Sequence, residues 1–131
     1  MKFDHIGIAT NDINETINKL SKFMNITYKS DIIYDELQEA NLCVLTLDGA
    51  IKIELIQGKI VENILKKRQY LYHTCYSVDN IEDTVKSLVS EGALVISEVK
   101  PAILFNMRKV VFLMWDLGLI ELVEGENNGV N

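Results

Sequence analysis

The sequence contains few of the residues that mark specialised classes of protein. Its 131 residues include one Pro, one Trp and two Cys. The cysteines, Cys43 and Cys75, lack CxxC spacing and lie in apolar, strand-like runs, so we predict neither a structural disulfide nor a thiolate metal site. We interpret both as small core residues in a reducing compartment.

No apolar run is long enough to cross a bilayer. The longest, residues 110–115, is far short of the ~20 residues that a membrane-spanning helix needs. The N-terminus does not resemble a signal peptide, because Asp4, His5 and Asp12 interrupt any apolar stretch of the required length. We therefore predict a cytoplasmic protein without a membrane partner.

Positive charge is also scarce. Thirteen basic residues stand against nineteen acidic ones, which gives a net charge of −6. Such a chain repels phosphate backbones and offers little counterion release, so we expect no nucleic-acid partner.

Length and composition are those of an ordinary globular domain. Nearly half of the residues are apolar and about a quarter are charged. A chain of 131 residues is close to the usual size of one domain. We predict a single domain over residues 1–125 and a disordered tail over residues 126–131.

The sequence repeats itself. Residues 72–88 echo residues 4–20 at an offset of 68, and residues 118–125 echo residues 51–58 at an offset of 67. The first echo aligns His5 with His73, Asp12 with Asn80, Ile13 with Ile81, Thr16 with Thr84 and Leu20 with Leu88. The second aligns Glu54 with Glu121. Each half thus has a His near its start and a Glu near its end, which indicates two copies of one supersecondary unit.

The first half reads as βαβββ. Alternating residues predict a strand over 2–10, and the capping pattern of Asp12 and Glu15 begins a helix with apolar residues at Ile13, Ile17, Leu20 and Met24, closed by Asn25. Three strands follow, at residues 28–34, 40–47 and 51–57. Asp48-Gly49 is a strong signal for a hairpin between the last two.

The second half repeats this order after a linker helix. We divide the domain into module one (1–58), a linker helix within 59–70 and module two (71–125). Module two has a strand at 71–78, a helix at 81–90 closed by Gly92, strands near 94–99, 108–115 and 119–124, and a loop at 101–107. We predict an α+β fold in which the tandem modules form one curved, eight-stranded mixed sheet with a central cleft.

His5, Glu54, His73 and Glu121 are the candidate functional residues. Each alone can be an ordinary core or surface residue. Their recurrence at matching places, beside small residues such as Gly7 and Cys75, favours a shared site, because a carboxylate among strand aliphatics is rarely buried without a partner. Nitrogen and oxygen donors without thiolate suit a divalent ion such as nickel, cobalt, manganese, zinc or iron.

At these residues the chain resembles the vicinal oxygen chelate superfamily, the glyoxalase/bleomycin resistance fold, from Phe3 to Gly125. The segments HTCYSVDNI (73–81) and RKVVFL (108–113) look most like methylmalonyl-CoA epimerase, and the spacing of the two His and two Glu also looks like glyoxalase I. The resemblance implies that His5, Glu54, His73 and Glu121 bind one divalent metal ion and that Glu121 takes part in proton transfer. It also implies a second base, Glu39, with Glu36 as its rival.

The resemblance leaves three functions open. The first is an epimerase-like isomerase that removes the proton α to a carbonyl group of an acyl thioester, and the second is a lactoylglutathione lyase. The third is a non-catalytic protein that binds small molecules or drugs. The turn at Trp115-Asp116-Leu117-Gly118 differs from the DPDG-like turn usual in glyoxalases.

Two further expectations concern partners. The basic residues Lys66, Lys67 and Arg68, or Arg108 with Lys109, either meet phosphates or form solvated faces. We also expect a homodimer, since paired-module sheets leave strand edges that a partner can cover.

Overall fold

The computed structural model describes residues 1–36 and 38–125, so the tail predicted at residues 126–131 lies outside the described residues. The chain divides into two compact units. One is His5–Tyr72, and the other combines Met1–Asp4 with the chain from His73 onward. None of the helices in the described residues is long and apolar enough to cross a membrane.

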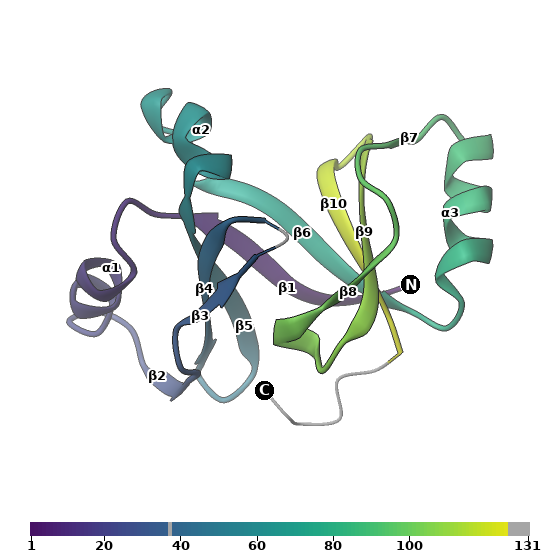
Figure 1. Ribbon diagram of the computed structural model, residues 1–131. Coiled ribbons are helices and arrows are strands. Elements are labelled where there is room, and N and C mark those ends of the chain that lie inside the picture. The colour runs from purple at the N-terminus through teal and green to yellow at the C-terminus, as the bar shows by residue number, and fades with distance from the viewer. Residues whose placement is uncertain (37, 126–131) are drawn as a thin grey trace. The chain divides into compact units, whose positions relative to one another are not determined.

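The unit His5–Tyr72 holds one helix against a mixed sheet, followed by the linker helices. Its elements are β1 (Lys2–Ala9, of which residues 5–9 belong here), α1 (Ile13–Leu20), β2 (Ile26–Lys29), β3 (Ile33–Asp35), β4 (Ala40–Leu47), β5 (Ile51–Gly58), the 3-10 helix η1 (Lys59–Val61) and α2 (Glu62–Lys66). The strands lie in the order β2-β4-β5-β1, with β3 also paired to β4 (Figure 1). β1 and β5 run parallel, whereas the other pairs are antiparallel.

The other unit repeats this plan. Its elements are β6 (Leu71–Val78, from residue 73 on), α3 (Ile81–Ser90), β7 (Leu94–Val95), β8 (Lys100–Ala102), η2 (Ile103–Phe105), β9 (Arg108–Trp115) and β10 (Gly118–Glu124). The strand order is β6-β10-β9-β7, with β8 also paired to β9. β6 and β10 are parallel, as β1 and β5 are. The predicted α+β class and the two related modules are therefore confirmed, with ten strands in the described residues where we predicted eight.

Two serines interrupt strands that we predicted as continuous. The predicted strand 28–34 is divided into β2 and β3, and the predicted strand 94–99 is shortened to β7. The Ser30 hydroxyl accepts the Val44 N–H at 2.8 Å, and the Ser97 hydroxyl accepts the Phe112 N–H at 3.0 Å. In each case a side chain takes a ladder bond that a backbone carbonyl would otherwise accept, so the strand ends there. Ser30 and Ser97 are 67 residues apart, at the same place in the repeat.

Two other predicted elements were wrong in extent. α1 ends at Leu20 and not near Asn25, because the Asn25 carbonyl accepts the Asp48 N–H and is tied to the β4–β5 turn. The predicted loop 101–107 begins with the short edge strand β8, where Pro101 is tolerated because an edge residue need not donate its N–H.

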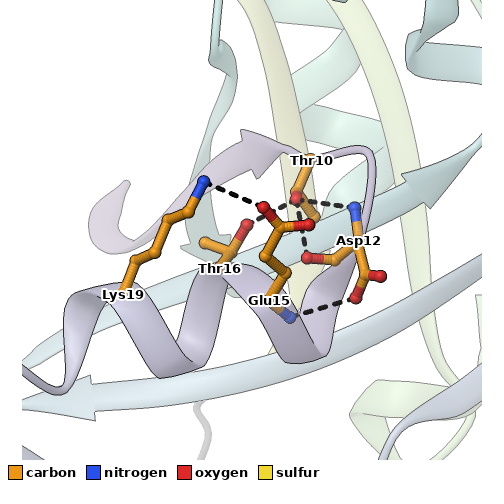
Figure 2. Close-up of polar contacts among 5 residues, drawn as sticks. All are labelled: Thr10, Asp12, Glu15, Thr16 and Lys19. Atoms are coloured by element: carbon orange, nitrogen blue, oxygen red, sulfur yellow. Dashed lines mark hydrogen bonds and ion pairs between the residues drawn. The ribbon is translucent and has the colours of Figure 1, made fainter.

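The predicted helix starts and hairpin are confirmed. Asp12 accepts the Glu15 N–H and Asn80 accepts the Asp83 N–H as N-caps of α1 and α3. Figure 2 shows the start of α1, where the hydroxyls of Thr10 and Thr16 lie 2.6 Å apart. In the hairpin, Asp48 and Gly49 have φ of 52° and 66°, the left-handed pair that a type I′ turn requires.

Each unit has its own apolar core between helix and sheet. In His5–Tyr72 the buried core includes Ile13 of α1 with Cys43, Leu45 and Leu55 of the sheet. In the other unit, Ile81 and Leu88 of α3 pack with the β9 and β10 residues Val111, Leu113, Ile120 and Leu122. Both cysteines are buried, and neither forms a disulfide.

Candidate functional site

The first half of the predicted site lies on the parallel strands β1 and β5. Gly7 is the register partner of Glu54, and His5 stands two residues before Gly7 on the same face of β1. His5 and Glu54 are both 2% exposed, and the His5 Nε2 lies 3.8 Å from the Glu54 Oε2. A glycine opposite the glutamate leaves the space that these two side chains occupy.

The second half has the same register on β6 and β10. Cys75 is the partner of Glu121, and His73 stands two residues before Cys75. The His73 Nε2 lies 3.2 Å from the Glu121 Oε1, and both side chains are buried. The rings of His73 and of Phe112 in β9 make an edge-to-face contact, with 5.3 Å between ring centroids and 87° between planes. Phe112 is also the β9 partner of Glu121, so it contacts the pair directly.

Each pair fits a divalent ion chemically. An imidazole nitrogen and a carboxylate oxygen are both Lewis bases, so they face each other only across a proton or a shared cation. Two ligands about 2.1 Å from a tetrahedral or octahedral ion stand about 3.0–3.4 Å apart. The 3.2 Å of His73 and Glu121 lies in this range, and the 3.8 Å of His5 and Glu54 is somewhat wider. The buried His and Glu of each unit are therefore suited to bind a metal ion.

The carboxylates proposed as a second base lie at an end of the sheet. Glu39 is exposed, has a φ of 51° and immediately precedes β4, and Glu36 is exposed in the turn after β3. Ala40 pairs with Gly58, whereas Val44 pairs with Glu54. The Glu39 backbone, five residues before Val44, thus lies about 17 Å along the strand from the level of Glu54.

Two of the basic residues considered for phosphate contacts are engaged within the protein. The Arg108 guanidinium donates to the carbonyls of Phe105, Glu124 and Gly125. Lys109 pairs with Glu82 at 3.0 Å, and this hydrogen bond raises the pKa of Lys109 and lowers that of Glu82. Lys66, Lys67 and Arg68 are all exposed.

Sequence reasoning missed two residues that hold the strands of the site in place. The Gln57 side chain accepts the Ile13 N–H at the start of α1, and Glu124 accepts the Ile81 N–H at the start of α3, both at 3.0 Å. Each stands three residues after a site glutamate, so it ties the strand of that glutamate to the helix that follows the strand of the histidine. The signal was present, because the second repeat aligns Gln57 with Glu124.

The protein consists of two related βαβββ modules. Each module has a buried His on its first strand and a buried Glu on its last, so each offers one nitrogen and one carboxylate ligand for a metal ion. A family model described as the Glyoxalase/Bleomycin resistance protein/Dioxygenase superfamily matches residues 4–112, and the chain belongs to this superfamily.

Its similar proteins include methylmalonyl-CoA epimerases. The mitochondrial methylmalonyl-CoA epimerase of Dictyostelium discoideum is 27% identical over 118 residues, which cover 86% of this chain and 69% of that protein. The epimerase of Mycobacterium tuberculosis has the same fold, with a TM-score of 0.74, 21% identity and coverage of 96% and 89% of the two chains. A variant of the Streptomyces coelicolor epimerase, in complex with 2-nitronate-propionyl-CoA, also has this fold. Its TM-score is 0.73 and its identity 18%, and the match covers 97% of this chain and 99% of that one.

Proposed function

We propose that this protein is a divalent-metal-dependent isomerase that removes the proton α to the carbonyl group of an acyl-CoA thioester, as a methylmalonyl-CoA epimerase does. The observation that carries the proposal is the identical register of the two His and Glu pairs, in which the residue two after each His faces the Glu. The names of the similar proteins, one of them bound to an acyl-CoA analogue, support the choice of substrate.

In this proposal His5, Glu54, His73 and Glu121 bind one ion. When bound, a divalent ion supplies Lewis-acid stabilisation of the negative charge that develops on a carbonyl oxygen. The carboxylate of Glu121 accepts the α-proton and can return it to the carbon. The edge-to-face contact with Phe112 restricts rotation of the His73 ring beside Glu121. Return of a proton to the opposite face needs a second acid, for which Glu39 is our candidate and Glu36 its rival.

The experiment compares two matched glutamates. We expect Glu121→Gln to lower deuterium incorporation at the α-carbon of methylmalonyl-CoA by about 10²- to 10⁴-fold, because an amide can bind a metal through oxygen but cannot accept the proton. Glu54→Gln, at the same place in the repeat, is the control and should lose much less. Both variants are loaded with metal and checked by elemental analysis, and exchange is followed by mass spectrometry in D₂O.

Undiminished exchange in Glu121→Gln contradicts the assigned role. Turnover of the methylglyoxal-glutathione hemithioacetal instead of methylmalonyl-CoA indicates the lyase, and turnover of neither favours a binding protein. Glu39→Gln and Glu36→Gln in the same assay decide which of the two is the second acid. A homodimer and a cytoplasmic location remain our predictions, and light scattering of the 14.9 kDa chain tests the first.

A further inference from the structure

A basic turn stands at the carboxyl end of β1 and β5, beyond the His5 and Glu54 pair. Ala9, the last residue of β1, donates its N–H to the Tyr70 carbonyl at 2.8 Å, which fixes the end of the linker segment beside that strand. Figure 1 shows α2 at this end of β1. From His5 to Ala9, and from Glu54 to Gly58, the strands advance four residues, or about 13 Å.

Residues 59–68 carry four basic side chains, Lys59, Lys66, Lys67 and Arg68, against one acidic side chain, Glu62. This local excess contrasts with the net charge of −6. The unit His5–Tyr72 has eight basic and nine acidic residues, a net charge of −1, so the remaining −5 of the net charge of −6 belongs to the rest of the chain. A polyanion approaching this turn therefore meets a locally positive surface.

Arg68 occupies a backbone position that normally favours glycine. Its φ is 55°, and the N–H groups of residues 67, 68 and 69 bond to the carbonyls of Ile64 and Leu65, closing α2. A left-handed residue just after a helix is usually Gly, because a Cβ is disfavoured there. The chain instead presents an exposed guanidinium at this point.

A hollow adjoins the turn within the same unit. It has a volume of about 490 Å³, and its lining includes Tyr70, Ile8 and Leu20 together with Thr16 and Glu15. Tyr70 is 57% exposed and offers an aromatic face, and Ile8 and Leu20 are apolar. The volume lies in the range of small-ligand sites, and the carboxylate of Glu15, near Lys19 in Figure 2, can accept from an exocyclic amine.

We propose that Lys66, Lys67 and Arg68 bind the phosphates, and the hollow beside Tyr70 the adenine, of the 3′-phosphorylated ADP end of an acyl-CoA. This inference rests on the proposed function for its substrate class. The pantetheine arm of CoA separates the thioester from the phosphates. With the carbonyl group near His5 and Glu54, the arm would pass around the end of β1, because Ile8 and the α1 residues of the hollow lie on the opposite face of that strand from His5. Guanidinium and ammonium groups are the usual partners of phosphate oxygens.

The first test measures affinity by calorimetry at low ionic strength with four probes: CoA, dephospho-CoA, adenosine 3′,5′-bisphosphate and pantetheine. We expect the triple variant Lys66→Gln, Lys67→Gln, Arg68→Gln to bind CoA and the bisphosphate at least about tenfold more weakly. The control triple, Lys22→Gln, Lys29→Gln, Lys86→Gln, removes the same charge from other exposed positions and should change affinity less than about twofold. Equal losses in both triples overturn the proposal.

Two single variants separate binding from folding. Arg68→Gly should keep or raise the melting temperature, because Gly relieves the left-handed backbone, and still weaken CoA binding. Tyr70→Ala should weaken the bisphosphate about fivefold or more through lost stacking, and leave pantetheine unchanged. Unchanged CoA affinity in Arg68→Gly, or pantetheine bound as tightly as CoA by the wild type, contradicts the site.

These experiments can reject the phosphate site without rejecting the proposed reaction, and the reverse. Epimerase turnover with a KM that the basic triple leaves unchanged removes the phosphate site and keeps the reaction. CoA binding that depends on the triple, without α-proton exchange, keeps the phosphate site and removes the reaction.

Discussion

At the scale of single residues, the burial of Cys43 makes the stability of the folded protein depend on pH. Its side chain lies in the core with Ile13, Leu45 and Leu55, and burial raises the pKa of the Cys43 thiol. A group whose pKa is raised on folding stabilises the folded state fully below its unfolded pKa, about 8.5 for a thiol, and this stabilisation is lost as the pH rises through the folded pKa.

We therefore predict that the free energy of unfolding falls above about pH 8.5 through Cys43. The comparison is between Cys75→Ala and the double variant Cys43→Ala, Cys75→Ala, by urea denaturation from pH 7 to pH 10. The fall should be steeper in the single variant, which retains the Cys43 thiol. Parallel profiles in the two variants contradict the prediction.

The candidate site residues could be chosen from the sequence, and the residues that contact them could not. His5, Glu54, His73 and Glu121 could be chosen because the repeat aligns them, and the structure pairs His5 with Glu54 and His73 with Glu121. Phe112 could not be chosen, because its contact with His73 depends on the β9–β10 register, which no local pattern encodes.

At the scale of elements, local sequence patterns predicted the positions of most strands. They failed where a side chain, and not a backbone carbonyl, accepts a hydrogen bond from the neighbouring strand. The bounds of β4, β6, α3 and β9 agree with those predicted, since each is a regular apolar pattern with a cap or turn beside it. Ser30 instead divides the predicted strand 28–34, and Ser97 shortens the predicted strand 94–99, each by accepting an N–H from a neighbouring strand. A serine in an alternating sequence gives no sign of that choice.

The glycines that end β5 and follow β10 make a prediction at this scale. A Cβ on Gly58 would lie 2.9 Å from the Glu39 oxygen and 3.0 Å from the Ala40 Cα, whereas one on Gly125 has no neighbour closer than 3.7 Å. Gly125 has a φ of 82°, so its requirement is conformational, and that of Gly58 is steric.

We expect Gly58→Ala to reduce the free energy of unfolding by about 1–3 kcal/mol, as overpacking does, and Gly58→Asn to cost more. At Gly125 the order should reverse, because Asn tolerates the left-handed region better than Ala. Urea denaturation of the four variants measures both orders. The same order at both glycines contradicts this assignment of causes.

At the scale of the whole molecule, the duplication is what made the fold predictable. One module alone has too few strands to identify an architecture, but two modules with the same order of elements restrict the choice strongly. The duplication also gives each unit one His and Glu pair of the candidate site. Each pair alone is suited to bind a metal ion, so the number of ions per chain is the property that tells one shared centre from two separate ones.

We predict one divalent ion per chain, held by both pairs. In elemental analysis after loading with nickel or cobalt and dialysis, His5→Ala and His73→Ala should each lose most of the bound metal, because removal of one ligand weakens a centre that all four residues share. The exposed carboxylate variant Glu36→Gln is the control and should retain the ion. The added metal should also raise the melting temperature of the wild type, by binding equivalent to about 2.7 kcal/mol at one hundred times the dissociation constant, and should not raise that of either histidine variant. Two ions per wild-type chain, with one retained in each single variant, would show that the pairs act separately and would contradict a common centre.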